Sequence, residues 1–198
     1  MRPSHLLAVV TFFVPALLAT PAGAGDAAVE LQRQADRVVT VLSDQDREPA
    51  QRQREVRAIV DETFDVQEAA RRTLGRAWAE RSEEERATFV RLFVDLLDRA
   101  YLRRLDSLDG QRIVVGDDVV ETDRATVRAA IVARDGERTP MDYVMRRSTD
   151  GRWRVVDVSV GGASLLGNYR AQFARLMQTG GFPHLIERLQ AKVSSLQP

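Results

Sequence analysis

The sequence predicts an α+β fold in which helices pack on a curved, mainly antiparallel four-stranded sheet. Apolar residues recur at three- and four-residue steps over residues 27–105 and again after residue 163, which is typical of amphipathic helices. Between these regions they alternate with polar residues, and β-branched side chains are frequent, which is typical of strands. Because helices and strands are grouped, the pattern disfavours alternating parallel βαβ units.

The first 24 residues are expected to form a secretory signal. Arg2 is followed by an apolar run at 6–19, which holds 14 residues, whereas a helix that crosses a bilayer needs ~20. The small residues at 22–24, Ala-Gly-Ala, favour cleavage after the last of them. We therefore expect residues 25–198 to form a single soluble domain in the periplasm, without a membrane anchor.

Composition and charge exclude several classes of protein. The 29 basic and 29 acidic residues cancel and are interleaved, so nothing favours nucleic-acid binding. The absence of cysteine excludes disulfides, thiolate catalysts and a lipid-modified cysteine. No histidine pair or calcium-loop spacing favours a metal, and His184, at a predicted helix start, is the only histidine after the signal. We therefore expect no enzyme, no cofactor and no metal.

Six helices are expected. Pro49 suits the first turn of the second helix, and Gly75 suits the left-handed end of the third. Ser82 followed by Glu85 predicts a capping box at the start of a long helix, which also explains the acidic run there. The first helix is polar enough to pack on the outside, and the long helix should cover the core. The expected ranges are 27–42, 49–64, 65–75, 82–105, 164–178 and 182–194.

Four consecutive strands follow the long helix, and such a series predicts an antiparallel sheet. Asp150-Gly151 between the third and fourth strands is a strong hairpin signal. Asp117 and Asp118 are neighbours on the first strand, so their side chains point to opposite faces, and both are expected at the solvated surface. The expected ranges are 111–119, 125–134, 139–147 and 152–160.

No catalytic or metal motif accounts for the apolar surface that the sequence predicts on the sheet and on the long helix. Periodicity does not distinguish a solid core from a pocket, and by itself it favours plain core. The sheet contributes Val127, Ala129, Ile131, Tyr143, Met145, Val156 and Val158, and the long helix contributes Phe89, Phe93, Leu97 and Tyr101.

The stretch from Trp153 to Phe173, WRVVDVSVGGASLLGNYRAQF, resembles the signature of the MlaC family of periplasmic phospholipid-binding proteins, also called toluene-tolerance proteins. The likeness spans nearly all of the chain after the signal. Upstream it includes Phe64-Asp65, Leu74-Gly75, Trp78 and Ser82, together with the apolar residues of the long helix. The resemblance implies a cone-like roll with an apolar cavity that holds lipid chains.

What the resemblance implies about function is transport without catalysis. Members carry phospholipid across the periplasm between an outer-membrane lipoprotein complex and an inner-membrane ABC transporter. Related members belong to hopanoid clusters, so a hopanoid or another lipid is the alternative cargo. A monomer is expected. The cavity candidates are the apolar residues of the sheet and long helix named above, together with Leu165, Tyr169 and Phe173.

Within this motif we assign structural roles from the residues themselves. Trp153 is expected in the core, and Gly161 with Gly162 is expected to form the turn that folds the following helix, from Ser164, back onto the sheet. Asp157 lies among valines, where an acid is costly unless it is paired. It either pairs with Arg170 or faces solvent, and Arg170 is alternatively a ligand for a lipid phosphate.

Two other functions compete with the carrier. An enzyme of the same fold class would need an acid–base pair inside the roll, where the residues named above are apolar. A periplasmic adaptor protein with a solid core would contain no bound lipid after purification. Lipid content therefore distinguishes carrier from adaptor.

Overall fold

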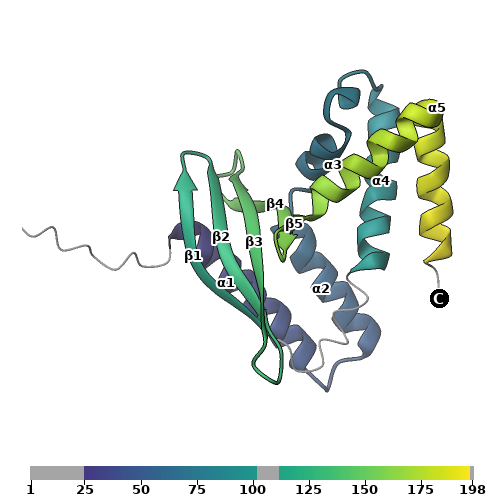
Figure 1. The fold of residues 1–198 in the computed structure, drawn as a ribbon. Coiled ribbons are helices and arrows are strands. Elements are labelled where there is room, and N and C mark those ends of the chain that lie inside the picture. The colour runs from purple at the N-terminus through teal and green to yellow at the C-terminus, as the bar shows by residue number, and fades with distance from the viewer. Residues whose placement is uncertain (1–24, 102–111, 197–198) are drawn as a thin grey trace, which may run out of the picture.

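The computed structural model describes residues 25–101 and 112–196 (Figure 1). Helices come first, strands second and a long helix last, which confirms the α+β class. The elements are α1 (Asp26–Ser43), α2 (Pro49–Thr63), α3 (Val66–Leu74), the 3₁₀ turn η1 (Gly75–Trp78), α4 (Glu83–Ala100), β1 (Arg112–Glu121), β2 (Arg124–Val132), β3 (Arg138–Arg147), β4 (Trp153–Val160), β5 (Ala163–Ser164) and α5 (Leu165–Ser195). The end expected for the long helix, Leu105, lies outside the described residues.

The sheet is an antiparallel meander in the order β1-β2-β3-β4-β5. It has five strands rather than the four expected, because β5 is only two residues long and a pattern of two residues carries no periodicity. The pairing shifts between Val115 and Asp118 on β1, and again near Val144 and Met145 on β3. Such bulges bend and twist the strands, and they account for the curvature that the sequence predicted.

The link between α2 and α3 attaches the helices to the edge of β4. Phe64 forms a parallel bridge with Val155, and the backbone N–H of Asp65 donates to the carbonyl of Val155 at 2.8 Å. The short β5 pairs with β4 only at its far end, at Ser159 and Val160. The rest of this strand edge is therefore partly covered by the link rather than left free.

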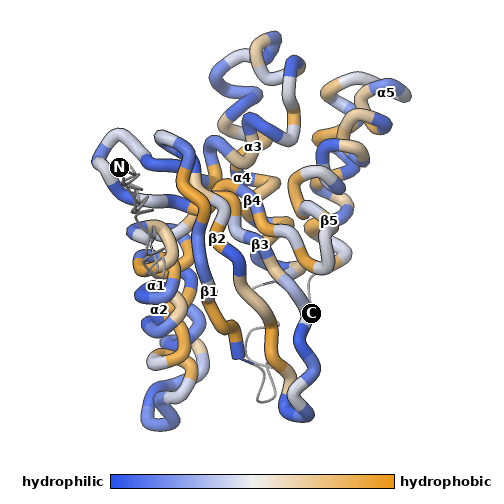
Figure 2. The backbone as a smooth tube through the Cα atoms, turned by 60° about the vertical axis from the view of Figure 1, so that its left-hand side comes forward, coloured by the Kyte–Doolittle hydropathy of each residue, from blue (hydrophilic) through white to orange (hydrophobic). Residues whose placement is uncertain are grey.

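One face of the sheet packs on α1, and we call β1–β5 with α1 the sheet half. The small residues Ala27 and Ala28 let α1 approach the strands closely, because they are almost fully buried against them. The first helix was expected to pack on the outside; its polar residues are largely exposed, while Ala27, Ala28 and Leu31 join the core of the sheet. Its other face contacts α2 (Figures 1 and 2). The buried core of the sheet half contains Ala27, Ala28, Leu31, Ala125, Val127, Met141, Tyr143, Met145, Trp153 and Val155.

The helices α3, α4 and α5 form a second core beside the sheet, and we call them the helical half (Figure 1). The apolar stripe of α4 packs against α3 and α5, so the expectation that this long helix covers the core of the sheet is wrong. Periodicity identified the buried face of α4 correctly but not its partner. The buried core of the helical half contains Ala69, Ala70, Leu74, Phe89, Val90, Leu92, Phe93, Leu96, Leu166, Phe173, Phe182, Leu185, Leu189 and Val193.

The last helix, α5, is two helices joined at a sharp bend. Gly180 and Gly181 have non-helical dihedral angles, and φ of Gly181 is 71°. A side chain at Gly180 would lie 2.6 Å from Cβ of His184, so the bend also needs a residue without Cβ. After the bend the chain runs back beside α4 (Figure 1). Two helices with this boundary were expected from the sequence. No helix in the described ranges is both long and apolar enough to cross a membrane.

Candidate functional site

An aromatic cluster lies at the centre of the helical half. Phe89 and Phe93 stack with ring centroids 5.8 Å apart, and Phe173 of α5 meets both edge-on at 5.6 and 5.8 Å. Tyr169 adds a further edge-on contact to Phe93 at 5.5 Å. Edge-to-face pairs at these distances are favourable beyond the area they bury. Phe89, Phe93 and Phe173 are buried, so these three cavity candidates are packed against protein in this structure.

The accessible margin of the helical half is formed by Leu97, Tyr101 and Tyr169. Leu97 and Tyr169 are half-buried against the aromatic cluster, and Tyr101 is 46% exposed. Burial raises the pKa of Tyr169 above its ordinary value, and a hydrogen bond with Tyr101 raises it further. The Tyr169 hydroxyl therefore stays neutral at any physiological pH. This margin combines apolar side chains with a pair of hydrogen-bonded hydroxyl groups.

The sheet half shows the same division between buried and accessible candidates. Val127 and Met145 are completely buried beneath α1, and burial raises the pKa of Tyr143 to about 12. Ala129 and Ile131, farther along β2, are only half-buried against the same core, as is Val158 on β4. The sheet therefore also has an accessible apolar margin.

Of the fourteen cavity candidates named from the sequence, half present surface in this structure. Phe89, Phe93, Val127, Tyr143, Met145, Val156 and Phe173 are buried. Leu97, Tyr101, Ala129, Ile131, Val158, Leu165 and Tyr169 are half-buried or exposed, and we call these seven residues the apolar margin. Of the fourteen candidates, only these seven can touch a ligand without repacking of a core.

The carboxylate of Asp157 does not pair with Arg170 but caps the start of α5. It accepts hydrogen bonds from the Ser164 hydroxyl at 2.6 Å and from the Leu166 N–H at 3.1 Å. Ser164 in turn accepts from the N–H of Gly167 at 2.8 Å. Together these bonds satisfy N–H groups that the first turn of a helix leaves without partners. Both alternatives stated for Asp157, a salt bridge and simple solvent exposure, are therefore corrected.

Arg170 is exposed and has no hydrogen-bond or ion-pair partner among the described residues. Its guanidinium lies against Gly75, whose φ is 58°, and a Cβ at Gly75 would meet it at 3.5 Å. Gly75 thus permits the contact between α5 and the end of α3. Arg170 is therefore available to bind an anion. The pairing expected between Arg170 and Asp157 does not form, because Asp157 caps the start of α5 instead.

The other motif residues lie close to where the sequence placed them. Trp153 is buried, with the Arg147 guanidinium 4.9 Å from the centre of its ring. Gly161 and Gly162 have φ values of 57° and 81°, and they form the turn between β4 and β5. These left-handed conformations favour glycine.

A second strand aspartate, Asp118, was expected at the solvated surface and instead caps α1. Its carboxylate accepts from the N–H of Gly25 at 2.9 Å and from the N–H of Ala28 at 3.1 Å. The bulge on β1 turns Asp118 toward α1, because it shifts the alternation of the strand. Asp117 is exposed as expected. Sequence spacing could not show this contact, since the partners are about ninety positions apart.

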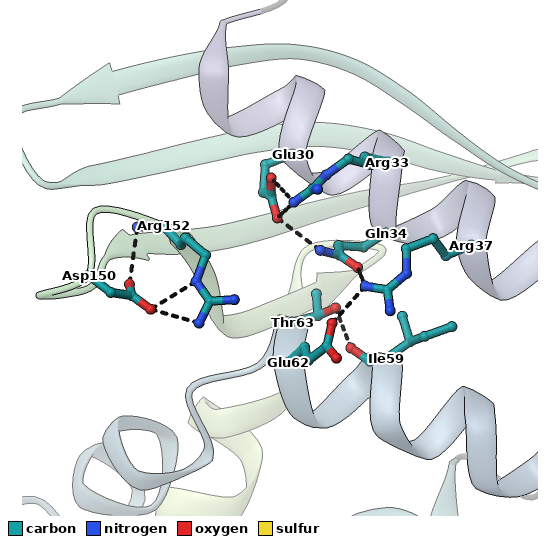
Figure 3. A network of polar contacts seen from close by, with 9 residues as sticks. All are labelled: Glu30, Arg33, Gln34, Arg37, Ile59, Glu62, Thr63, Asp150 and Arg152. Atoms are coloured by element: carbon teal, nitrogen blue, oxygen red, sulfur yellow. Dashed lines mark hydrogen bonds and ion pairs between the residues drawn. The ribbon is translucent and has the colours of Figure 1, made fainter.

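A charged network joins α1 and α2, and the Asp150–Arg152 pair of the β3–β4 turn lies near it (Figure 3). Gln34 is nearly buried; its side-chain amide donates to Glu30 and its oxygen accepts from Arg37, which also binds Glu62. The hydrogen bond and charge of Arg37 lower the pKa of Glu62. Nearby, a polar groove of about 530 Å³ between α1 and α2 is lined by Arg33, Asp36, Arg37, Thr40, Val41, Glu55, Ala58 and Ile59. Its lining mixes charged side chains with Val41, Ala58 and Ile59.

No cluster of three or more residues that could hold a metal ion occurs in the part of the chain that the structure describes. His184 is half-buried beside the bend of α5, and its Nδ1 lies 3.7 Å from a carboxylate oxygen of Glu187. The arrangement that remains is chemically simple: two packed cores with an accessible apolar margin, and the exposed Arg170, which has no partner among the described residues.

Comparison with known proteins gives one family and one fold. The family model described as "MlaC protein" matches residues 32–191. The Haemophilus influenzae protein named intermembrane phospholipid transport system binding protein MlaC is 22% identical over 196 residues, covering 94% of this chain and 92% of that one. A phospholipid-binding protein from Ralstonia solanacearum, solved in complex with a phospholipid, superposes with a TM-score of 0.76 at 24% identity. That match covers 87% of this chain and 99% of the other.

Proposed function

The chain belongs to the MlaC family, and we propose from this membership that it is a periplasmic phospholipid carrier that binds lipid acyl chains at its apolar margin. The observation that carries the proposal is the family match over residues 32–191. The shared fold with a structure that contains a phospholipid supports it. Export by a signal cleaved after Ala24 belongs to the same proposal.

The two cores suggest where the acyl chains lie. Leu97, Tyr101 and Tyr169 form the margin of the helical half, and Ala129, Ile131 and Val158 form that of the sheet half. Chains that bind between the two halves would cover both sets of side chains without disturbing either core. Each methylene removed from water contributes ~0.8 kcal/mol, so two chains suffice for tight binding with no specific polar contact.

The head group can then remain in water, and Arg170 is the candidate for contact with its phosphate. The side chain is exposed and unpaired within the described residues, so replacing it should not weaken the fold. We expect Arg170→Ala to lower phospholipid retention with an unchanged Tm. Arg175→Ala is the matched control, because Arg175 is an exposed arginine on the same helix. A lower Tm for Arg170→Ala alone would assign Arg170 a structural role instead.

The physiological role that follows is movement of lipid between an outer-membrane lipoprotein complex and an inner-membrane ABC transporter. A carrier of this kind catalyses no reaction. A hopanoid or another apolar lipid is the alternative cargo, because acyl chains and polycyclic lipids are both compatible with an apolar margin.

Native mass spectrometry of protein purified from the periplasm without detergent tests the proposal, followed by extraction and analysis of any bound lipid. We expect one lipid per chain. We further expect Ile131→Glu to lose the lipid, since a carboxylate at a half-buried apolar position opposes the binding of hydrocarbon. The control is Val119→Glu, at a position 50% exposed on the first strand, which should keep the lipid. Wild-type protein that stays lipid-free after incubation with phospholipid vesicles would overturn the proposal in favour of an adaptor.

A further inference from the structure

The first helix begins without a cap of its own. Gly25 occupies the N-cap position and has no side chain to offer, so the first N–H groups of α1 depend on another part of the chain. Asp118 supplies the acceptor from β1. One oxygen of its carboxylate accepts from Gly25 at 2.9 Å, and the other accepts from Ala28 at 3.1 Å. A single carboxylate thus holds both the helix and the residue that precedes it.

The contact with Asp118 requires glycine at position 25. A Cβ on Gly25 would lie 2.4 and 2.7 Å from the two carboxylate oxygens and 2.9 Å from the carboxylate carbon. These distances are shorter than any real contact, so any other side chain would displace Asp118. Position 25 is also the residue directly after the small residues Ala22-Gly23-Ala24, which favour cleavage by a signal peptidase.

We infer that Asp118 is the binding site for the mature N-terminus of this protein. Hydrolysis of the Ala24–Gly25 peptide bond consumes one water and leaves a carboxylate on Ala24 and an ammonium on Gly25. The nitrogen that now donates as an amide at 2.9 Å becomes a cation in contact with the Asp118 carboxylate. The inference rests on the export of the chain that the proposed function includes.

The charges at this site explain why a carboxylate is needed there. The N-terminus of a helix carries a partial positive charge, so a free ammonium placed beside it is unfavourable. Asp118 lies between the two, because it accepts from Gly25 on one oxygen and from the first turn of α1 on the other. Processing therefore converts a hydrogen bond into an ion pair that holds α1 on the sheet. In the precursor the same nitrogen is an amide and carries no charge.

One feature of the composition makes the ion pair measurable. Lys192 is the only lysine in the chain, and it is exposed in the last turn of α5. In a Lys192→Arg protein the α-amino group is then the only primary amine left after cleavage. Acetylation followed by intact-mass spectrometry reports that group alone.

The experiment begins with the full-length Lys192→Arg precursor, exported and isolated from the periplasm. We expect an intact mass that corresponds to residues 25–198, and acetylation of the α-amino group about threefold to tenfold slower than in the same protein with Asp118→Asn, because pairing favours the unreactive ammonium. Acetylation should lower the Tm of the Asp118 protein and leave that of the Asp118→Asn protein unchanged. Asp117→Asn, which changes an exposed neighbouring carboxylate, is the matched control and should behave as the parent.

Two outcomes would overturn the inference. One is a mature mass that places the N-terminus at another residue. The other is an equal acetylation rate in the Asp118 and Asp118→Asn proteins, with equal effects on Tm. Bound lipid is measured on the same samples, so a lipid-loaded protein that gives either result contradicts this inference and leaves the carrier proposal intact.

Discussion

The sheet half and the helical half bury their cores in different ways. The helical half is built on large aromatic side chains, with four phenylalanines in its core and edge-to-face contacts between α4 and α5. The sheet half combines methionine, valine, Tyr143 and Trp153 with alanines that let α1 approach the strands. Each half satisfies its own packing, and each keeps half-buried or exposed apolar side chains, which make up the apolar margin. A lipid carrier needs such surface, and the comparison suggests that it arises where two cores meet without merging.

The largest effect is expected from opening a void in the helical half. Phe93→Ala removes a completely buried ring that contacts Phe89, Tyr169 and Phe173, and it should lower the free energy of unfolding by ~3–5 kcal/mol. Urea unfolding followed by circular dichroism measures it. Leu97→Ala, at the half-buried margin one turn later, should cost clearly less. Equal losses for the two variants would contradict the separation of core and margin.

A void in the sheet half should also lower the free energy of unfolding, independently of a void in the helical half. Met145→Ala removes a fully buried side chain beneath α1 and should cost ~2–4 kcal/mol. Because Met145 and Phe93 belong to different cores, the losses in the double variant should add to within about 0.5 kcal/mol. A coupling well above this value in the same urea experiment would show that the two cores act as one.

The junction of the two halves should respond to loss of the cap on α5. Asp157→Ala leaves the Leu166 N–H and the Ser164 hydroxyl without their acceptor and should lower the free energy of unfolding by about 1–2 kcal/mol. Asp142→Ala, on an exposed position of the adjacent strand β3, is the control and should change stability by less than about 0.5 kcal/mol. Thermal unfolding distinguishes them, and similar Tm values would rule out a stabilising cap.

The smallest effect concerns pH and the contact between α3 and β3. Hydrogen bonds from Arg71 and then Arg72, against the opposing effect of burial, lower the pKa of Glu68 from 4.5 to about 2, and Arg146 of the sheet half lies 4.0 Å away. A carboxyl whose pKa is lower in the folded state stabilises the fold above pH 4.5, and this stabilisation is lost as the pH falls toward 2.

Unfolding in urea at pH 6 and at pH 3, conditions on either side of ~4.5, measures this contribution. We expect Glu68→Gln to be less stable than the wild type by roughly 1 kcal/mol at the higher pH, with a smaller difference at the lower one. Glu84→Gln, at an exposed position in the first turn of α4, should show no such change in the difference. A stability difference between the wild type and Glu68→Gln that is larger at pH 3 than at pH 6 would contradict this prediction.

Local pattern and chemistry determined much of this protein from the sequence alone. The order of helices and strands, the capping box of Ser82 and Glu85, and the division of α5 near Gly181 all depend on neighbours a few positions apart. The motif that begins at Trp153 identified the family, which the match over residues 32–191 confirmed. Periodicity also identified the buried faces of α2 and α4.

Only the tertiary structure decided what each buried face packs against. Periodicity defines an apolar stripe but not its partner, so the sequence paired the α4 stripe with the sheet, whereas α1 lies there. For the same reason the cavity candidates could not be divided into core and margin. The caps made by Asp118 and Asp157 were also beyond the sequence, because periodicity does not show the strand bulges near these residues, and the partners of Asp118 lie about ninety positions away.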